Sequence, residues 1–221
     1  AAAEQNILGL VMCNNHGGGL LQSPFGGIDA RMSPNPIAVG IPTGGDFPVI
    51  VDMTASVVAE GKIRVKRNLG EKLPEGWAID GDGNPTTEPD GFYGPPRGAI
   101  LPFGGISAHK GYALSIVVDV LSGALGGAGL SREGGGRGGN GVFVMAIDIA
   151  AFIATEDFER DMQTFIGWLK SSRLMDGFNE IILPGELEYR KRLEKEADGV
   201  FIDDESWRQI SATGAEVGVT L

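Results

Sequence analysis

Residues 101–114 read Leu101-Pro102-Phe103-Gly104-Gly105-Ile106-Ser107-Ala108-His109-Lys110-Gly111-Tyr112-Ala113-Leu114. This stretch runs from a glycine-rich loop into an apolar segment, which predicts a helix from His109 to Leu125. A helix start carries unpaired backbone N–H groups and the positive end of the helix dipole. With His109 and Lys110 beside it, this start predicts a site for a phosphate or a carboxylate. The alternative, that His109 caps the helix and Lys110 is a solvated surface charge, stays open.

The composition is that of an ordinary globular protein. Of the 221 residues, 42% are hydrophobic and 21% charged, which suits one large domain or two small ones. The net charge of −11 argues against nucleic acid and anionic membranes as main partners, but it allows small anionic ligands at a local positive cluster. A single cysteine excludes an internal disulfide framework, and no secretory signal or membrane-spanning run is visible. The cytoplasm is the expected location.

The first residues are typical of the last turn of a helix. The run Ala1-Ala2-Ala3-Glu4-Gln5 has no initiator Met, and a strand-like run from Ile7 to Met12 follows at once. The tail of a helix needs the rest of its helix in order to pack. We therefore expect the chain to be truncated at its N-terminus.

Apolar runs bounded by turn residues predict strands at 7–12, 37–41, 48–52, 142–148 and 181–183. Periodicity and capping residues predict helices at 54–69, 109–125, 156–171, 186–197 and 204–212. Thr54 or Ser56 is expected to cap the first helix. The second helix is apolar on most faces, which indicates a central position.

Two stretches are predicted to be loops. Residues 71–102 show no sustained period and are expected to form a long functional loop or lid. Residues 126–141 are rich in glycine, lack the context of a phosphate-binding P-loop, and are expected to be a flexible surface loop. Strands and helices alternate only loosely, and no G-x-G-x-x-G follows a strand. The expected fold class is α/β of the α+β type, with a mixed, largely antiparallel sheet flanked by helices and no Rossmann nucleotide site.

Two further turns resemble the one at His109. Residues Asp52 to Ser56 end a predicted strand and open a predicted helix, and Leu183-Pro184-Gly185-Glu186 does the same. Ordinary helix capping accounts for each turn equally well or better. An elongated ligand such as a dinucleotide needs more than one anchor, so several turns of this kind favour a binding site more than one alone.

Other reactive side chains give weaker indications. Asp80 could orient a substrate, although an Asp before Gly81 is more often part of a turn. His16 lies in a loop that could approach a cofactor, although a lone loop histidine is more often exposed. Cys13 has no nearby His and acid and is expected to be a buried, inert thiol. Two histidines and one cysteine far apart give no zinc spacing, so no metal is expected.

These residues together resemble the malate/L-lactate dehydrogenase family of the sulfolactate dehydrogenase type. The resemblance is carried, in this order along essentially the whole chain, by Asn35-Pro36-Ile37-Ala38, Val51-Asp52-Met53-Thr54-Ala55-Ser56, Gly76-Trp77-Ala78-Ile79-Asp80 with Pro85-Thr86-Thr87, Leu101-Pro102-Phe103-Gly104-Gly105 with His109-Lys110-Gly111-Tyr112, and Leu183-Pro184-Gly185-Glu186. Members of that family are cytoplasmic, dimeric oxidoreductases that use NAD or NADP to interconvert 2-keto and 2-hydroxy acids on a non-Rossmann fold.

The resemblance implies positions for the site. Cofactor contacts would be made by Asp52, Met53, Thr54, Ala55, Ser56, Val57, Val58, His109, Lys110, Gly185, Glu186 and Leu187. Asp80 falls where some members place an acidic catalytic residue. Residues 1–150 would form the nicotinamide-cofactor-binding domain, and residues 151–221 would continue the sheet domain and add the returning C-terminal helices.

The chain departs from the family in one respect. The proton-donating histidine of the family, with the arginine and second histidine that hold the substrate, would lie in a segment before Ala1. General-acid help is worth roughly 10²–10⁴-fold in rate, so the chain alone is expected to be inactive. Two alternatives stay open: a non-catalytic module that binds a nucleotide or another anion, and a structural domain in which these turns only cap helices.

Overall fold

A computed structural model describes residues 1–132, 139–202 and 204–219. The contacts within the chain divide it into two units, Ala1–Gly185 and Glu186–Leu221. The expected flexible loop at 126–141 falls partly on residues 133–138, which lie outside the described residues. The functional domains predicted at 1–150 and 151–221 concern cofactor binding and stay a prediction.

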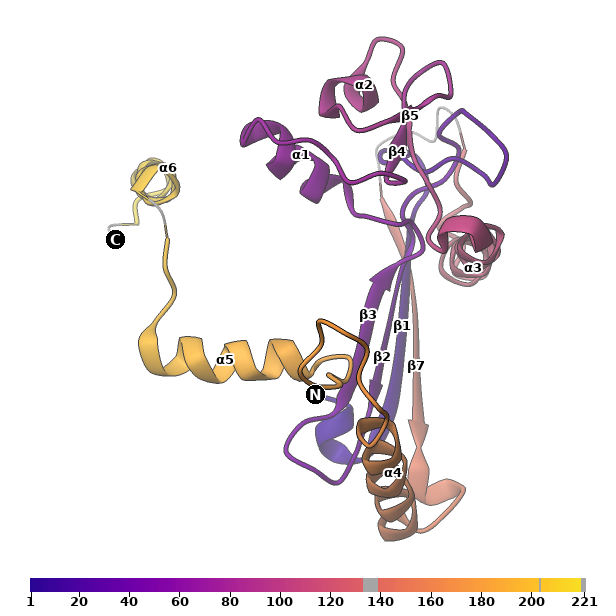
Figure 1. The fold of residues 1–221 in the computed structure, drawn as a ribbon, viewed down its shortest axis with the longest axis vertical. Coiled ribbons are helices and arrows are strands. Elements are labelled where there is room, and N and C mark those ends of the chain that lie inside the picture. The colour runs from indigo at the N-terminus through magenta and orange to yellow at the C-terminus, as the bar shows by residue number, and fades with distance from the viewer. Residues whose placement is uncertain (133–138, 203, 220–221) are drawn as a thin grey trace. The chain divides into compact units, whose positions relative to one another are not determined.

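The first unit is built on an antiparallel sheet of four strands in the order β3-β2-β1-β7 (Figure 1). The strands are β1 (Ile7–Asn15), β2 (Pro36–Ile41), β3 (Val49–Thr54) and β7 (Asn140–Asp148). Runs of Val, Ile and Leu explain why these segments are extended, because β-branched side chains pack well on a pleated surface. In the register, Val11 lies opposite Ala38 on one side and Val144 on the other. The antiparallel fold class predicted from the sequence is confirmed.

A second, smaller sheet with two short helices holds the main apolar core. It contains β5 (Pro85–Thr86), β4 (Ala78–Ile79) and β6 (Ala99–Ile100), and α1 (Glu60–Asn68) and α2 (Pro89–Tyr93) pack with it. The core cluster consists of Val58, Ile63, Leu73, Ala78, Phe92 and Ile100. The prediction of a structureless loop at 71–102 was therefore wrong. Elements of two to five residues are too short to show a period.

The predicted helix at 54–69 begins later than expected. Its N-cap is Ala59, which makes no side-chain capping bond, and the helix starts at Glu60. The hydroxyl of Thr54 donates to the Ser56 carbonyl, and the hydroxyl of Ser56 donates to the Val58 carbonyl. Neither residue caps a helix, because the chain after β3 stays extended and pairs with residues 101–103.

Helix α3 (His109–Asp119) continues into the π-helical turn η3 (Val120–Ala124), as the sequence predicts for 109–125. Its buried face carries mostly small and polar residues, namely Gly111, Ser115, Asp119, Ser122 and Gly123, together with the apolar Val118. Its apolar residues Ile116, Val117 and Val120 are 42–46% exposed. The prediction that this helix is central rather than on the surface was therefore wrong. Hydrogen bonds and close backbone contacts, rather than apolar burial, seat its inner face.

A buried amide anchors the far end of α3 to the large sheet. Nδ2 of Asn14, on β1, donates to Oδ1 of Asp119 at 2.6 Å, and Oδ1 of Asn14 accepts from the Gly141 N–H on β7 at 3.0 Å. The second Asp119 oxygen accepts from the Ser131 N–H. A buried carboxylate needs such donors to offset its lost hydration.

The remaining elements complete the two units. The first unit has 3₁₀ turns η1 (Ala3–Gln5), η2 (Gly105–Ser107) and η4 (Ile149–Ala151), and helix α4 (Thr155–Lys170). The second unit contains α5 (Glu186–Asp198) and α6 (Asp204–Glu216). Residues 181–183 are not a strand, contrary to the prediction: the chain turns at Pro184 and Gly185, and one bond from the Ile50 N–H to the Pro184 carbonyl fixes it beside β3. Among the helices of the described residues, none combines the length and apolar character needed to cross a bilayer.

Candidate functional site

Two of the three turns predicted to bind a ligand come together in the first unit. After β3, the Val57 N–H donates to the Leu101 carbonyl at 2.9 Å, and the Phe103 N–H donates to the Ala55 carbonyl at 3.0 Å. These bonds join the segment that follows Asp52 to the glycine-rich loop that leads into α3. Residues about fifty positions apart in the sequence therefore form one continuous surface.

The start of α3 presents exposed cationic and polar groups. Gly104 and Gly105 have φ values of +117° and +54°, which let the loop turn sharply into η2 and then α3. His109 and Lys110 are both exposed, and the N-cap residue Ala108 makes no side-chain capping bond. His109 therefore does not cap the helix. The helix start and the Lys110 ammonium can together attract an anion.

Gly111 allows α3 to approach the loop closely. A Cβ atom at this position would lie 2.4 Å from the Phe103 carbonyl oxygen and 2.7 Å from the Phe103 nitrogen. Any larger residue would push the helix start away from the backbone of residues 101–103. The position of Lys110, one residue earlier, depends on this contact.

A second loop reaches the same place. The string Pro-Phe-Gly-Gly-Ile occurs at 24–28 and again at 102–106. Gln22 and Ile100 form a parallel bridge just before the two strings, so both loops leave in the same direction. The ring of Phe25 lies edge-on to His109 with 5.8 Å between centroids, and Phe25 is 53% exposed. Phe25 was not among the predicted site residues, although the repeated pentapeptide was a visible indication of it.

The predicted cofactor residues after β3 differ in what they can offer. Asp52 and Met53 have exposed side chains, whereas Ala55, Ser56 and Val58 are buried. The buried three can contribute only backbone groups. Thr54 and Val57 are half-buried.

The third predicted turn is divided between the two units. Gly185, with φ of +88°, packs against Ile50 of β3: a Cβ there would lie 2.9 Å from the Cβ of Ile50. Glu186 and Leu187 belong to the second unit, where Glu186 accepts a hydrogen bond from Arg190 at 2.6 Å. Their part in binding stays a prediction.

Asp80 closes a turn. Its Oδ1 accepts from the Asn84 N–H at 2.9 Å and from the Asp82 N–H at 3.0 Å. These donors, above all Asn84, lower the pKa of the Asp80 carboxyl. The geometry is that of the turn-forming Asp weighed from the sequence, and a catalytic role stays a prediction.

Cys13 lies near the end of β1 and His16 in the loop after it, and both side chains are half-buried. Nδ1 of His16 is buried and has no hydrogen-bond partner among the described residues. Burial raises the pKa of the Cys13 thiol, which keeps the thiol protonated near neutral pH. Within residues 1–132, 139–202 and 204–219, no three His, Cys, Asp or Glu side chains come together as metal ligands would.

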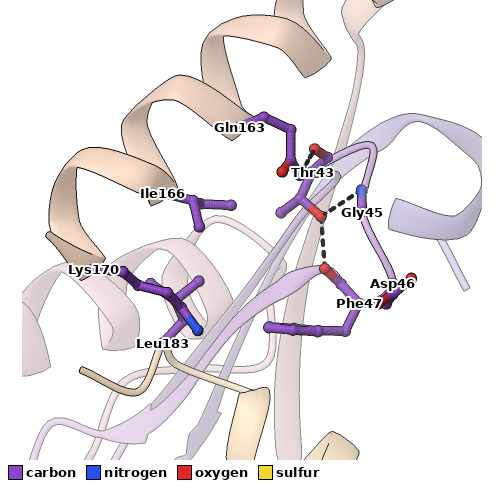
Figure 2. Close-up of a pocket in the computed structure, with 8 residues that line it drawn as sticks. All are labelled: Thr43, Gly45, Asp46, Phe47, Gln163, Ile166, Lys170 and Leu183. Atoms are coloured by element: carbon purple, nitrogen blue, oxygen red, sulfur yellow. Dashed lines mark hydrogen bonds between the residues drawn. The ribbon is translucent and has the colours of Figure 1, made fainter. Parts of the chain in front are cut away.

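A cavity of about 260 Å³ lies elsewhere in the first unit (Figure 2). It is lined by Thr43, Gly45, Asp46, Phe47, Gln163, Ile166, Lys170 and Leu183. Gln163 of α4 donates to the Thr43 carbonyl, and the Thr43 hydroxyl donates to the Phe47 carbonyl. Leu183, the first residue of the third predicted turn, lines this cavity, whereas none of the predicted cofactor contacts does.

The turn at Asp80 yields a test. Asp80→Asn keeps an acceptor oxygen for the two N–H groups and removes the charge, whereas Asp80→Ala removes both. We expect Asp80→Ala to melt at a lower temperature than Asp80→Asn in thermal denaturation followed by circular dichroism. Because the folded pKa is lowered, the charge stabilises the wild type above the ordinary value of 3.8, and this advantage over Asp80→Asn is lost as the pH falls through the lowered pKa. Melting of Asp80→Ala at the wild-type temperature would show that the turn does not depend on this side chain.

Known proteins resemble the chain in sequence and in fold. The family model described as malate/L-lactate dehydrogenase matches residues 1–211. Malate dehydrogenase of Pyrococcus horikoshii is 41% identical over 193 residues, which cover 84% of this chain and 52% of the relative. L-sulfolactate dehydrogenase of Methanothermobacter thermautotrophicus is 32% identical over 226 residues, which cover 100% of this chain and 62% of the relative.

The fold agrees with these sequence matches. The solved structure of sulfolactate dehydrogenase from Methanocaldococcus jannaschii superimposes with a TM-score of 0.81 at 33% identity, covering 99% of this chain and 62% of that one. The chain thus spans little more than half of the length of its relatives. The resemblance predicted from the sequence is confirmed, and the chain belongs to the malate/L-lactate dehydrogenase family.

Proposed function

We propose that this chain is the coenzyme-binding part of an oxidoreductase that uses NAD or NADP to interconvert 2-keto and 2-hydroxy acids. The observation that carries the proposal is the joining of the Asp52–Val58 segment, the Leu101–Phe103 loop and the start of α3 beside Lys110. Relatives are named malate, L-lactate and L-sulfolactate dehydrogenases, which supports the substrate class. A cytoplasmic location stays a prediction.

The exposed groups of this surface suit a dinucleotide. The Lys110 ammonium and the N–H groups at the start of α3 would hold a phosphate. The exposed Asp52 carboxylate would accept hydrogen bonds from ribose hydroxyls, and the exposed Phe25 ring offers an apolar face to a base. The bound coenzyme would supply the hydride, and the protein must supply the proton. These residues do not distinguish NAD from NADP.

The reaction also needs a residue that donates a proton to the substrate. The family resemblance assigns this role to a histidine that neither His16 nor His109 matches. Within the chain there are two histidines, and His109 belongs to the proposed coenzyme surface. His16 is half-buried with an unpaired Nδ1 among the described residues, and histidine is the commonest general acid near neutral pH. The family resemblance gives His16 no such role, so a turnover assay on a His16 variant tests whether His16 donates the proton.

A homodimer is the proposed assembly. The outer face of α3 carries the exposed apolar residues Ile116, Val117 and Val120 in a helical stripe. Contiguous exposed apolar surface of this kind marks interaction sites in soluble proteins. A second copy of the chain would cover it.

The first test is coenzyme binding, followed by nicotinamide fluorescence with NADH and NADPH. We expect Lys110→Ala to weaken binding by about 1–3 kcal/mol, the scale of a lost charge-assisted hydrogen bond. Lys62→Ala is the matched control, because Lys62 is an exposed lysine on α1 outside the proposed surface. An unchanged dissociation constant in Lys110→Ala would show that this lysine is only solvated. Absence of wild-type binding at millimolar coenzyme would contradict the proposed function.

The second test measures NADH oxidation with 2-keto acids, with His109→Gln for comparison. If His16 donates the proton, His16→Gln lowers turnover by about 10²-fold or more and leaves NADH affinity unchanged, because general acids act on the chemical step. Turnover that survives His16→Gln contradicts this role. A wild-type chain that binds NADH without turnover supports a donor outside the chain, or a non-catalytic binding module.

The third test is the mass of the chain in solution by light scattering. We expect a dimer for the wild type and a monomer for Val117→Lys, because a buried lysine at an apolar interface has no charge partner. The exposed Lys62→Ala variant should stay dimeric. A wild-type monomer would exclude this assembly.

A further inference from the structure

A buried polar cluster lies beneath the proposed coenzyme surface. It consists of Gln22, Asn35 and Ser115, each of which has an exposed fraction of 0%. Nε2 of Gln22 donates to the Ser115 hydroxyl at 2.7 Å, and Nδ2 of Asn35 donates to the Ser115 carbonyl at 3.0 Å. Three separate stretches of the chain therefore meet at one serine on α3.

Each member of the cluster is tied to one part of the coenzyme surface. The Ser115 hydroxyl donates to the Gly111 carbonyl at 3.1 Å, so the bond from Gln22 continues into the first turn of α3, next to Lys110. The Ala55 N–H is shared between two carbonyls: it donates to the Pro34 carbonyl at 2.8 Å and to the Asn35 carbonyl at 3.3 Å. Asn35 thus contacts the segment after β3 through its backbone and α3 through its side chain.

Gln22 connects the two Pro-Phe-Gly-Gly-Ile loops to the same cluster. Its neighbour Ser23 donates its N–H to the Ile100 carbonyl at 3.1 Å, and the Ile100 N–H donates to the Leu21 carbonyl at 2.8 Å. Both loops begin within two residues of these bonds. A displacement of Gln22 would therefore move the base of each loop together with α3.

The cluster costs stability that an apolar cluster would not. Oε1 of Gln22 and Oδ1 of Asn35 are buried without a partner among the described residues. Asn35 also adopts a φ of +44°, a left-handed conformation that asparagine and glycine adopt more readily than other residues. Hydrogen bonds are directional, whereas apolar contacts are not, so this arrangement fixes orientation at the expense of stability.

We propose that Gln22, Asn35 and Ser115 are positioning residues, which hold the segment after β3, the two glycine-rich loops and the start of α3 in the arrangement that binds the coenzyme. The inference rests on the proposed function. The three side chains are fully buried, so they touch no ligand and act through Ala55, Gly111 and the loops.

The test uses hydrogen exchange of the full chain, read by mass spectrometry on peptides. Asn35→Gly keeps the positive φ and removes the amide. Gln22→Met keeps the side-chain length and removes the Gln22 amide. This variant replaces Asn35→Gly in the experiment if Asn35→Gly does not fold. Thr43→Val is the control, because Thr43 is 3% exposed and makes comparable side-chain bonds at residues 43–47 of the same unit. NADH affinity is measured on the same proteins by fluorescence.

We expect Asn35→Gly to speed exchange at both 53–58 and 107–113 by about tenfold, and to raise the NADH dissociation constant by a similar factor. Thr43→Val should speed exchange only near 41–47 and leave NADH affinity unchanged. Faster exchange at only one of the two segments, uniform loosening of the whole unit, or unchanged NADH affinity in Asn35→Gly would overturn the proposal. If the wild type binds neither NADH nor NADPH, the proposed function fails, while the exchange pattern still decides whether the cluster couples the segments.

Discussion

The close approach of α3 to its surroundings is the contact on which the site depends. Gly111 lies against the backbone of Phe103, and a Cβ on Gly123 would lie 2.3 Å from Nδ2 of Asn14. Between these two glycines, Ser115 and Asp119 accept hydrogen bonds from buried amides of other segments. Contacts this close leave room for little apolar packing besides that of the buried Val118. Directional bonds therefore contribute much of what holds the helix, and the orientation of its first turn, with His109 and Lys110, follows from them.

The sequence predicted the large sheet well and the small one not at all. The runs at 7–12, 37–41 and 142–148 are rich in Val, Ile and Leu and are flanked by turn residues. The local sequence was therefore enough to predict these strands. The core around Phe92 and Ile100 is built from elements of two to five residues, which depend on contacts distant in sequence rather than on period. The helix starting at Glu60 was placed too early because Thr54 and Ser56 have the chemistry of caps. Their hydroxyls instead donate to carbonyls two residues further along the chain. The backbone of Ala55 and Val57 pairs with residues 101–103.

The candidate site was predictable only where it depends on local sequence features. The turn at His109 and Lys110 is a local feature, and the structure places it beside the segment after Asp52, as a shared ligand would require. Phe25 reaches His109 only because Gln22 pairs with Ile100, a contact between residues 78 positions apart that no local pattern records. Asn35 belongs to the Asn35-Pro36-Ile37-Ala38 motif, yet the role proposed for it depends on its backbone conformation and on its contact with Ser115, and neither can be read from residue order.

The two faces of α3 do different physical work. The inner face carries glycine, serine and aspartate, whose bonds and close contacts define where the helix lies, and one fully buried apolar residue, Val118. The outer face carries Ile116, Val117 and Val120, whose burial would be favourable at roughly 25 cal/mol per Å² wherever a partner surface covers them. A helix that used apolar contacts on its inner face could slide by small amounts at little cost, since such contacts have no direction. Because the inner face orients the helix and the outer face is free to associate, a partner could cover the outer face without changing the inner bonds. The turn that carries Lys110 would then stay in place.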